Sequence, residues 1–407
     1  MTQPESENLV LEGKTGGYKW IVLLLATGTQ ASATMVNYGV GPLAYFWKQE
    51  YHLTQMQTGT IISAMSIGPL VCMLLIGRML DRWQERQIIG WGSILLGLSF
   101  LAVAKVPSFP ALLFTLLVAG MFYSTAQPGG SKAVIKWFPR EIRGLAMGIR
   151  QAGIPIGGGL GGLIIPPISV MYGWPSAVFV ISGLCAGAGI LFLIFYKEPP
   201  TSHRVSIHGY GKTFHMQIGA ILKDKSLYPI FFAGICMISL QMVMIGHLTI
   251  FLVHNEALTP VFAGFVYSVA LFCGMAGRVL LAWISDYLFH GNRRRPFLIS
   301  IVSTFLLICL FALKPLTYPV WILFLISGLL GFLGMGWYSL FIVEVAEKAE
   351  KDSVAVTVSF ALTLNQAMII AAPPLFGWIV DTVGYSWAWL SLAALVFLAG
   401  VGMWKSQ

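Results

Sequence analysis

The sequence contains few charged residues. Asp, Glu, Lys and Arg make up 10% of its 407 residues, and its mean hydropathy is +0.78. A soluble domain contains about 25% of these residues, so the composition excludes a soluble protein. Apolar runs long enough to cross a bilayer as helices recur along the chain. They predict twelve membrane-spanning helices, at residues 20–46, 57–80, 88–104, 109–136, 144–171, 175–196, 227–253, 260–285, 296–313, 318–343, 354–380 and 386–404.

Motifs for covalent chemistry are also scarce. The five cysteines all lie in apolar spans, which favours packing residues over disulfides. The sequence contains no cluster of metal ligands and no pairing of a nucleophile with a base, so we expect no enzyme activity, metal or cofactor. The glycine-rich stretch Gly153–Pro167 lacks the Gly-Lys-Ser/Thr ending of a phosphate loop. Its glycines at a spacing of four predict close helix packing instead.

The formal net charge is +9, but its distribution argues against a nucleic-acid partner. With both termini in the cytoplasm, three basic residues lie outside (Lys48, Lys105 and Lys314) and two lie within the membrane (Arg150 and Arg278), which leaves twenty of the 25 in cytoplasmic segments. This asymmetry follows the positive-inside rule. It predicts a multi-pass protein of the plasma membrane, such as a bacterial inner membrane. The expected partners are then the surrounding lipids of the bilayer rather than nucleic acid.

The longest polar stretch divides the chain into halves with six predicted spans each. We expect an N-terminal six-helix bundle at residues 1–196, a cytoplasmic linker at 197–226 and a C-terminal six-helix bundle at 227–407. Short segments repeat between the halves: "GRMLDRWQER" matches "AWISDYLFHGNRRR", and "GMFYS" matches "MGWYS". The predicted fold is therefore an all-α membrane protein, in which two pseudo-symmetric bundles face each other across a central site.

The segment "GRMLDRWQER" (Gly77–Arg86) resembles the Gly-x-x-x-Asp-Arg signature that follows the second span in the major facilitator superfamily. This resemblance implies the twelve-helix fold and transport by alternating access. It also implies a cytoplasmic latch, in which Asp81, Arg82, Arg86 and Asp286 hold neighbouring helices together. Elementary electrostatics agrees with that role, because a carboxylate is stabilised at a helix N-terminus and arginine binds carboxylates bidentately.

The segment "FPREIRGLAMGIRQAGIPIG" (Phe138–Gly157) resembles the monocarboxylate carriers and their oxalate–formate antiporter relatives, and its first part also resembles the anion–cation symporters. The resemblance implies a small organic anion as substrate, moved with a proton or in exchange for another anion. A proton-coupled monocarboxylate such as lactate is the first expectation. A dicarboxylate or other organic-anion exchanger and an anion–cation symporter are the alternatives; a drug exporter or a non-transporting receptor is more remote.

Two arginines are predicted to lie deep in the membrane. Arg278 precedes Asp286 by eight residues, about 12 Å of helix, and Arg150 follows Arg143 by seven, about 10 Å. Charged residues at such depth are costly and usually functional. No acidic residue is predicted near the midplane, so we expect an anionic substrate to supply the missing charge. The alternatives are a structural arginine bonded to helix carbonyls or tyrosines, and for Arg150 a role at the interface between the halves.

Other polar residues in the predicted spans are candidates to line the site. Tyrosine hydroxyls and amides donate hydrogen bonds to a carboxylate, although helix–helix hydrogen bonds account for amides equally well. The candidates for substrate binding are Tyr123, Tyr338, Asn365 and Gln127, and further amides lie at Gln366 and Gln241. His247 is the candidate for proton coupling, because histidine titrates near neutrality and no carboxylate lies deep in the membrane.

Overall fold

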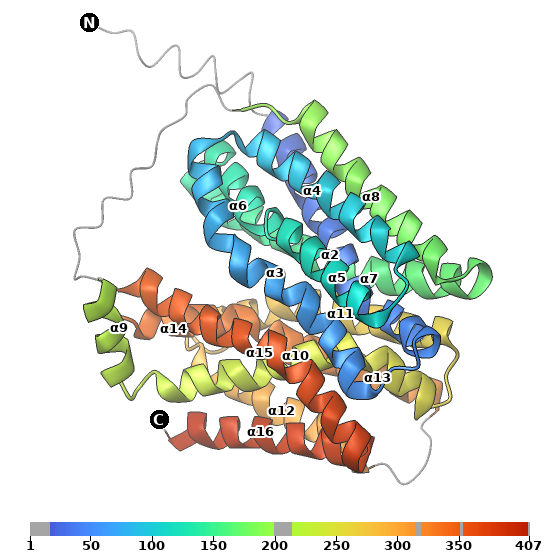
Figure 1. Ribbon diagram of the computed structural model, residues 1–407. Coiled ribbons are helices and arrows are strands. Elements are labelled where there is room, and N and C mark those ends of the chain that lie inside the picture. Colours follow the sequence, from blue (N-terminus) through green and yellow to red (C-terminus); the bar gives the residue numbers. More distant parts are fainter. Residues whose placement is uncertain (1–16, 199–213, 314–318, 351–352, 406–407) are drawn as a thin grey trace, which may run out of the picture.

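The computed structural model describes residues 17–198, 214–313, 319–350 and 353–405 (Figure 1). Within these ranges the chain forms α-helices and one short 3-10 helix, η1 (Ala102–Lys105), and contains no strand. Ten helical segments are long and apolar enough to cross a membrane. Helices α2 and α3, with 33 and 28 residues, also exceed the length needed. The all-helical fold with twelve spans that the sequence predicts is thereby confirmed.

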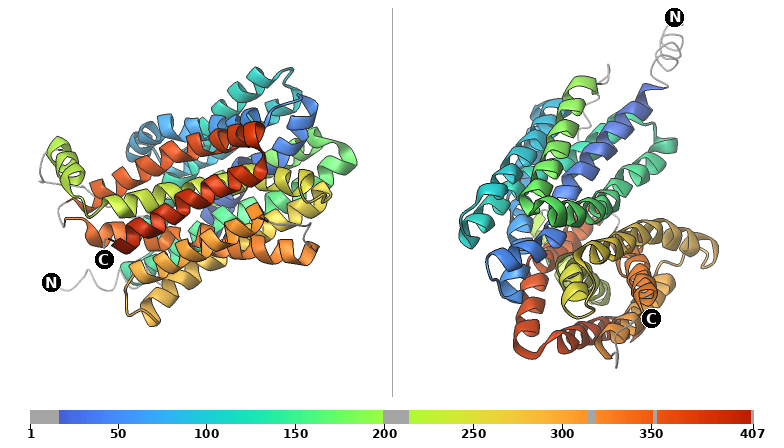
Figure 2. Two further views of the ribbon diagram at one scale, coloured as in Figure 1. Left: turned by 90° about the horizontal axis from the view of Figure 1, so that it is seen from below. Right: turned by 90° about the vertical axis from the view of Figure 1, so that its right-hand side faces the viewer.

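The helices gather into two groups that follow the order of the chain, as Figure 1 and the right-hand view of Figure 2 show. The N-terminal half contains α2 (Tyr18–Glu50), α3 (Gln55–Arg82), α4 (Glu85–Leu101), α5 (Phe109–Tyr123), α6 (Ala126–Trp137), α7 (Arg140–Tyr172) and α8 (Trp174–Phe195). The C-terminal half contains α10 (Tyr228–His254), α11 (Pro260–Tyr287), α12 (Arg294–Leu313), α13 (Val320–Gly336), α14 (Tyr338–Lys348), α15 (Val354–Val383) and α16 (Tyr385–Lys405). The described part of the predicted linker contains α9 (Phe214–Lys223).

The fourth span of each half consists of two consecutive helices. In the N-terminal half α5 ends at Tyr123 and α6 begins at Ala126, and in the C-terminal half α13 ends at Gly336 and α14 begins at Tyr338. These interruptions coincide with the repeated segments "GMFYS" and "MGWYS". Carbonyls at the end of a helix have no partner in the next turn. Each interruption therefore places backbone acceptors beside a tyrosine in the middle of a span.

The fifth and sixth spans of each half are joined by the same kind of turn. Gly173 separates α7 from α8 with φ +82°, and Gly384 separates α15 from α16 with φ +88°. Positive φ values are accessible to glycine at little cost and disfavoured for other residues. The equivalent turns reinforce the internal repeat that the sequence suggests.

The halves contact each other mainly along three helix pairs, α2 with α10, α7 with α11, and α3 with α15, and α3 also contacts α10. Glycine allows the close approach. A Cβ atom on Gly41 would lie 1.9 Å from the carbonyl oxygen of Ile245, and one on Gly264 would lie 2.5 Å from that of Gly162. We call the end of the molecule with Glu85 and Glu198 the linker end, because the N-terminal half runs into the linker there. The opposite end, where α3 begins and α15 finishes, is the far end.

Candidate functional site

Arg278 lies in the C-terminal half with its side chain half-buried. Its Nε donates a hydrogen bond of 3.3 Å to the carbonyl oxygen of Met335, and its guanidinium carbon lies 5.3 Å from the centroid of the Tyr338 ring. In the part of the chain that the structure describes, no carboxylate forms an ion pair with Arg278. A backbone dipole and an aromatic face thus stabilise the charge, and the fork of the guanidinium is left for another acceptor.

Glycines in the segment "GMAGR" place Arg278 against the interrupted span. A Cβ atom on Gly277 would lie 2.1 Å from the carbonyl oxygen of Phe332, and one on Gly274 would lie 2.9 Å from Cβ of Met335. Helices α11 and α13 are therefore in backbone contact here. The Oγ of Ser339 also donates to the carbonyl oxygen of Arg278 at 2.9 Å. The glycines of α11 and the hydroxyl of Ser339 thus hold the arginine beside the break between α13 and α14.

An aromatic side chain of the N-terminal half lies within electrostatic range of this arginine. Tyr38 of α2 interacts electrostatically with Arg278, Tyr123 and Tyr338, and its hydroxyl lies beside the amide of Gln241. The backbone carbonyl of Tyr38 accepts a 2.9 Å hydrogen bond from the hydroxyl of Tyr267 of α11. Of the residues predicted from sequence, the structure thus brings Arg278 and Tyr338 into contact and places Tyr123 within electrostatic range of the same Tyr38. It also adds Tyr38, which sequence reasoning missed because an aromatic residue in an apolar span gives no distinctive signal.

Arg150 lies in α7 with no exposed surface. Its Nη2 donates to Oε1 of Gln30 at 2.9 Å and to the carbonyl oxygens of Ala126 and Gln127 at 3.1 and 2.6 Å. Its Nε and Nη1 have no hydrogen-bond partner among the described residues. A Cβ atom on Gly130 would lie 2.7 Å from Nε, so a larger residue at position 130 would displace the guanidinium from this position. In this conformation Arg150 bonds to groups of its own half, on α2 and α6.

The predicted amides have different surroundings. Asn365 is 2% exposed, and neither its Oδ1 nor its Nδ2 has a partner among the described residues. Its Oδ1 would lie 3.2 Å from a Cβ atom on Gly234. Gln127 reaches Arg150 through its backbone carbonyl, while its side chain is half-buried. Gln366 donates across the halves to the carbonyl oxygen of Ser66 at 3.0 Å. Gln241 also has a buried Oε1 without a partner, but among the predicted amides Asn365 is the one whose oxygen and nitrogen both lack a partner in the described residues.

His247 is completely buried between α10 and α15. Its Nε2 lies 2.9 Å from the carbonyl oxygen of Pro373, and its ring centroid lies 5.2 Å from that of Phe376. Its Nδ1 has no hydrogen-bond partner among the described residues. Because a carbonyl oxygen only accepts, Nε2 carries the proton in the neutral ring and Nδ1 is left as a free acceptor.

The residues predicted to form a latch lie at the linker end. Asp286 forms an ion pair with Arg293 of its own half, which also lies 3.7 Å from Glu347. The side chain of Arg86 donates through Nε to the carbonyl oxygen of Leu193, at the end of α8. Arg82 is exposed at the end of α3, and the side chain of Asp81 lies outside the described residues.

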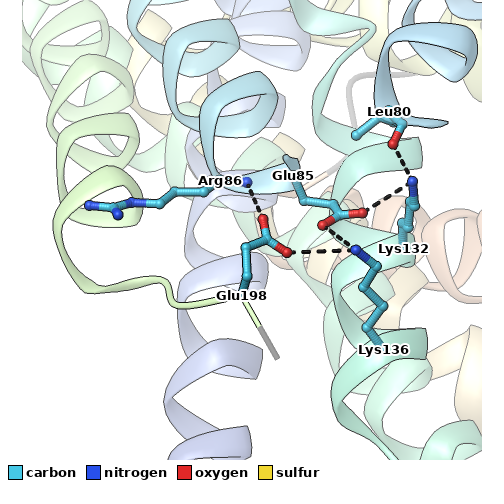
Figure 3. A network of polar contacts seen from close by, with 6 residues as sticks. All are labelled: Leu80, Glu85, Arg86, Lys132, Lys136 and Glu198. Carbon is cyan, nitrogen blue, oxygen red and sulfur yellow. Dashed lines mark hydrogen bonds and ion pairs between the residues drawn. The ribbon is translucent and has the colours of Figure 1, made fainter. Parts of the chain in front are cut away.

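Figure 3 shows that the polar network of the N-terminal half centres on Glu85, which is fully buried. Its two carboxylate oxygens lie 3.1 Å from Nζ of Lys132 and 2.7 Å from Nζ of Lys136. Glu198 lies 3.6 Å from Lys136 and accepts from the backbone N–H of Arg86. Burial and the neighbouring Glu85 carboxyl raise the pKa of Glu198. Sequence reasoning missed Glu85 because its partners lie on another helix.

A family model described as "Major Facilitator Superfamily" matches residues 26–373. The chain is 28% identical over 391 residues to an uncharacterized MFS-type transporter of Mycobacterium tuberculosis, covering 95% of this chain and 84% of the relative. It is 25% identical to a probable galactarate/D-glucarate transporter of Bacillus subtilis, over 82% of this chain and 79% of the relative. Its fold matches a bacterial homolog of the human lysosomal transporter Spinster, with a TM-score of 0.80, 13% identity and coverage of 96% and 97%.

These proteins are transporters rather than enzymes, in agreement with the motifs that the sequence lacks. The matches support the broad resemblance to the superfamily. The narrower resemblance to monocarboxylate carriers and oxalate–formate antiporters stays a prediction.

Proposed function

Because the chain belongs to the major facilitator superfamily, and is thus a multi-pass secondary transporter, we propose that it carries a small organic anion whose carboxylate binds Arg278. The observation that supports this proposal is the half-buried Arg278, whose guanidinium has no carboxylate partner in the described residues. A charge in a low-dielectric site is unfavourable unless it is compensated. A substrate carboxylate supplies the opposite charge in the bidentate geometry that arginine favours.

The other predicted residues take supporting roles in this proposal. The hydroxyls of Tyr123 and Tyr338 donate to the substrate, and Asn365 contributes the amide that has no partner in its own half. Arg150, bonded to the backbone carbonyl of Gln127, places the second of the two arginine charges close to Tyr123. The two bundles, residues 1–196 and 227–407, move relative to each other, and Asp81, Arg82, Arg86 and Asp286 act at the linker end.

Within the class of organic anions, a monocarboxylate such as lactate, moved together with a proton, is the first candidate. His247 is then the proton carrier, since its Nδ1 is a free acceptor at the interface of α10 and α15. A dicarboxylate or sugar acid is the second candidate. It is favoured by the Bacillus relative, whose printed name gives the dicarboxylates galactarate and D-glucarate.

We propose that the linker end faces the cytoplasm of a bacterial cell and the far end faces outside. Basic residues gather at the linker end, among them Lys132, Lys136, Arg293 and Arg294. Cytoplasmic loops carry the excess of Lys and Arg in membrane proteins.

A binding screen tests the proposed substrate class. The purified protein is heated with L-lactate, D-glucarate and their uncharged analogues at equal concentration, and unfolding is followed. A ligand that binds the folded state raises the apparent unfolding temperature, so we expect stabilisation by at least one carboxylate and none by the neutral analogues. Equal stabilisation by acids and neutral analogues would contradict anion recognition.

Coupling is tested in sealed proteoliposomes with the carboxylate that the screen selects. A proton symporter accumulates it only while a pH gradient exists, and an ionophore that collapses the gradient stops accumulation. Replacing His247 with Gln should then abolish accumulation but leave exchange intact. Accumulation that needs an anion on the opposite side, and no pH gradient, identifies an exchanger and contradicts the role of His247.

A further inference from the structure

The first turn of α3, at the far end, has an unusual set of hydrogen-bond partners. The first four N–H groups of a helix have no acceptor within the helix. Here the capping box of Thr54 and Gln57 satisfies two of them: the N–H of Gln57 donates to Oγ1 of Thr54 at 3.2 Å, and the N–H of Thr54 donates to Oε1 of Gln57 at 3.0 Å. The N–H groups of Gln55 and Met56 remain.

Those two groups are satisfied by the other half of the molecule. The N–H of Gln55 donates to Oδ1 of Asp381 at 2.9 Å, and the N–H of Met56 donates to Oδ2 at 2.8 Å. Asp381 lies near the end of α15, separated from Gln55 by 326 residues in the chain. Its carboxylate thus uses both oxygens to cap a helix of the opposite bundle. A negative charge in this position is further stabilised by the helix dipole.

The capping contact stands at the end of a longer seam between α3 and α15. A Cβ atom on Gly377 would lie 2.2 Å from the carbonyl oxygen of Gln55, and one on Gly59 would lie 2.3 Å from that of Pro373. Further along, Oγ of Ser63 donates to the carbonyl oxygen of Ile370. That carbonyl lacks its usual helical donor, because residue 374 is a proline without an N–H.

The seam continues toward the middle of the molecule. Gln366 donates to the carbonyl oxygen of Ser66 at 3.0 Å. The contacts therefore run from Gln55 to Ser66 along α3, eleven residues or about 16 Å of helix, roughly half the thickness of a bilayer core. A movement that opens the far end must separate these helices and release Asp381 from α3.

We propose that Asp381 is a latch between the two halves, which stabilises the conformation with a closed far end and must release the first turn of α3 when that end opens. This inference rests on the transporter architecture and does not depend on which anion is carried. The closed conformation alone pairs the carboxylate with two backbone donors. In the open conformation, water solvates both the carboxylate and the two N–H groups, so removal of the carboxylate penalises only the closed state.

The expected effect follows from the usual contribution of a capping side chain. Loss of such a cap shifts a two-state equilibrium about fivefold. Asp381→Ala should therefore raise the population with an open far end about fivefold. Asp381→Asn keeps Oδ1 but loses the charge and the second acceptor, so it should give a smaller shift in the same direction.

Thr54→Ala is the matched control. It removes a cap from the same turn of the same helix, but that cap comes from the N-terminal half itself and is present in both conformations. It should lower the stability of α3 without changing the balance between closed and open far ends. A structural loss at this helix terminus is thereby separated from loss of the latch.

The experiment measures the distance across the far end by double electron–electron resonance. Spin labels are attached to cysteines at the exposed positions Glu50 and Ser386, in a variant whose five native cysteines are replaced. The longer distance should gain population in Asp381→Ala and, less so, in Asp381→Asn, but not in Thr54→Ala. Distance distributions unchanged by both Asp381 variants would overturn the proposal, as would an equal shift in Thr54→Ala. If Asp381→Ala does not fold, the Asn variant alone decides.

Discussion

Replacing Arg278 with Gln is the most direct test of the proposed binding site. In the described structure the guanidinium uses one hydrogen bond, the 3.3 Å contact between Nε and the Met335 carbonyl, and one contact with the Tyr338 ring. Its two Nη groups remain for the substrate. A bidentate carboxylate would form two charge-assisted hydrogen bonds there, each contributing about 1.5–3 kcal/mol.

A glutamine side chain offers one amide group in place of the two Nη groups and carries no charge. The loss on substitution is therefore about 3 kcal/mol, the lower end of that range for two bonds. Since 1.4 kcal/mol corresponds to a tenfold change in Kd, Arg278→Gln should weaken binding by about 100-fold. Arg278→Lys keeps the charge but loses the fork and the planar contact with Tyr338, so a smaller loss of about tenfold is expected.

The assay is a titration of purified protein with the carboxylate that stabilises it most, read by thermal shift and by uptake into proteoliposomes. Arg143→Gln is a suitable control, because Nε of Arg143 also donates to a backbone carbonyl, that of Phe138 at 3.1 Å, but lies at the linker end of α7. Its affinity should stay within about twofold of the native protein, a change below 0.5 kcal/mol. A folded Arg278→Gln variant with native affinity would refute the reasoning and make Arg278 a structural residue.

Three further perturbations test other parts of the structure. Glu198→Gln should flatten the pH dependence of stability. Because the pKa of Glu198 is raised in the folded protein, its stabilising contribution is complete below the unfolded pKa of about 4.3 and is lost as the pH rises through the folded pKa. The unfolding temperature of the native protein should therefore fall over this interval, and that of the variant should fall less. A steeper slope in the variant would contradict this assignment. Gly277→Ala should lower the free energy of unfolding by at least about 1 kcal/mol, because the added Cβ would meet the carbonyl oxygen of Phe332. Gly183 has open space around it, so Gly183→Ala should be neutral or stabilising in the same unfolding assay. Tyr338→Leu should reduce substrate affinity more than Tyr338→Phe, since only Leu also removes the ring beneath Arg278, an interaction of about 0.5–2 kcal/mol; equal losses in binding titrations would show that the hydroxyl alone matters.

Hydropathy and internal repeats were sufficient to predict the fold. The twelve apolar runs correspond to the helical spans, including the fourth spans, whose repeated "GMFYS" and "MGWYS" segments stand at the interruptions before α6 and α14. These features depend on local sequence, because each span must satisfy its own backbone hydrogen bonds in a lipid environment. A short-range pattern therefore determines most of the architecture.

The candidate site was only partly predictable, because it depends on which face each helix presents. Counting residues from the predicted interface assigns both arginines a similar depth, but depth alone does not distinguish Arg278, which is half-buried, from Arg150, which has no exposed surface. Close packing between α7 and α2 accompanies this burial: a Cβ atom on Gly153 would lie 2.8 Å from the carbonyl oxygen of Thr27 and 3.3 Å from Cβ of Gln30, whose amide bonds Arg150. Tyr38 joins the site through a similar long-range arrangement, which no periodicity in the sequence reveals.

Arg150 and Arg278 show how a membrane protein accommodates positive charge within its spans without an ion-paired carboxylate among the described residues. Both lie against the fourth span of their own half: Arg150 against the first turn of α6, and Arg278 against the last turn of α13. Backbone carbonyls there provide the negative end of a dipole, which lowers the cost of the charge but does not neutralise it. Arg150 adds the Gln30 amide and complete burial, so no space is left for a ligand in this conformation. Arg278 instead keeps exposed surface and an aromatic partner, so the same backbone support leaves its charge available to an anion.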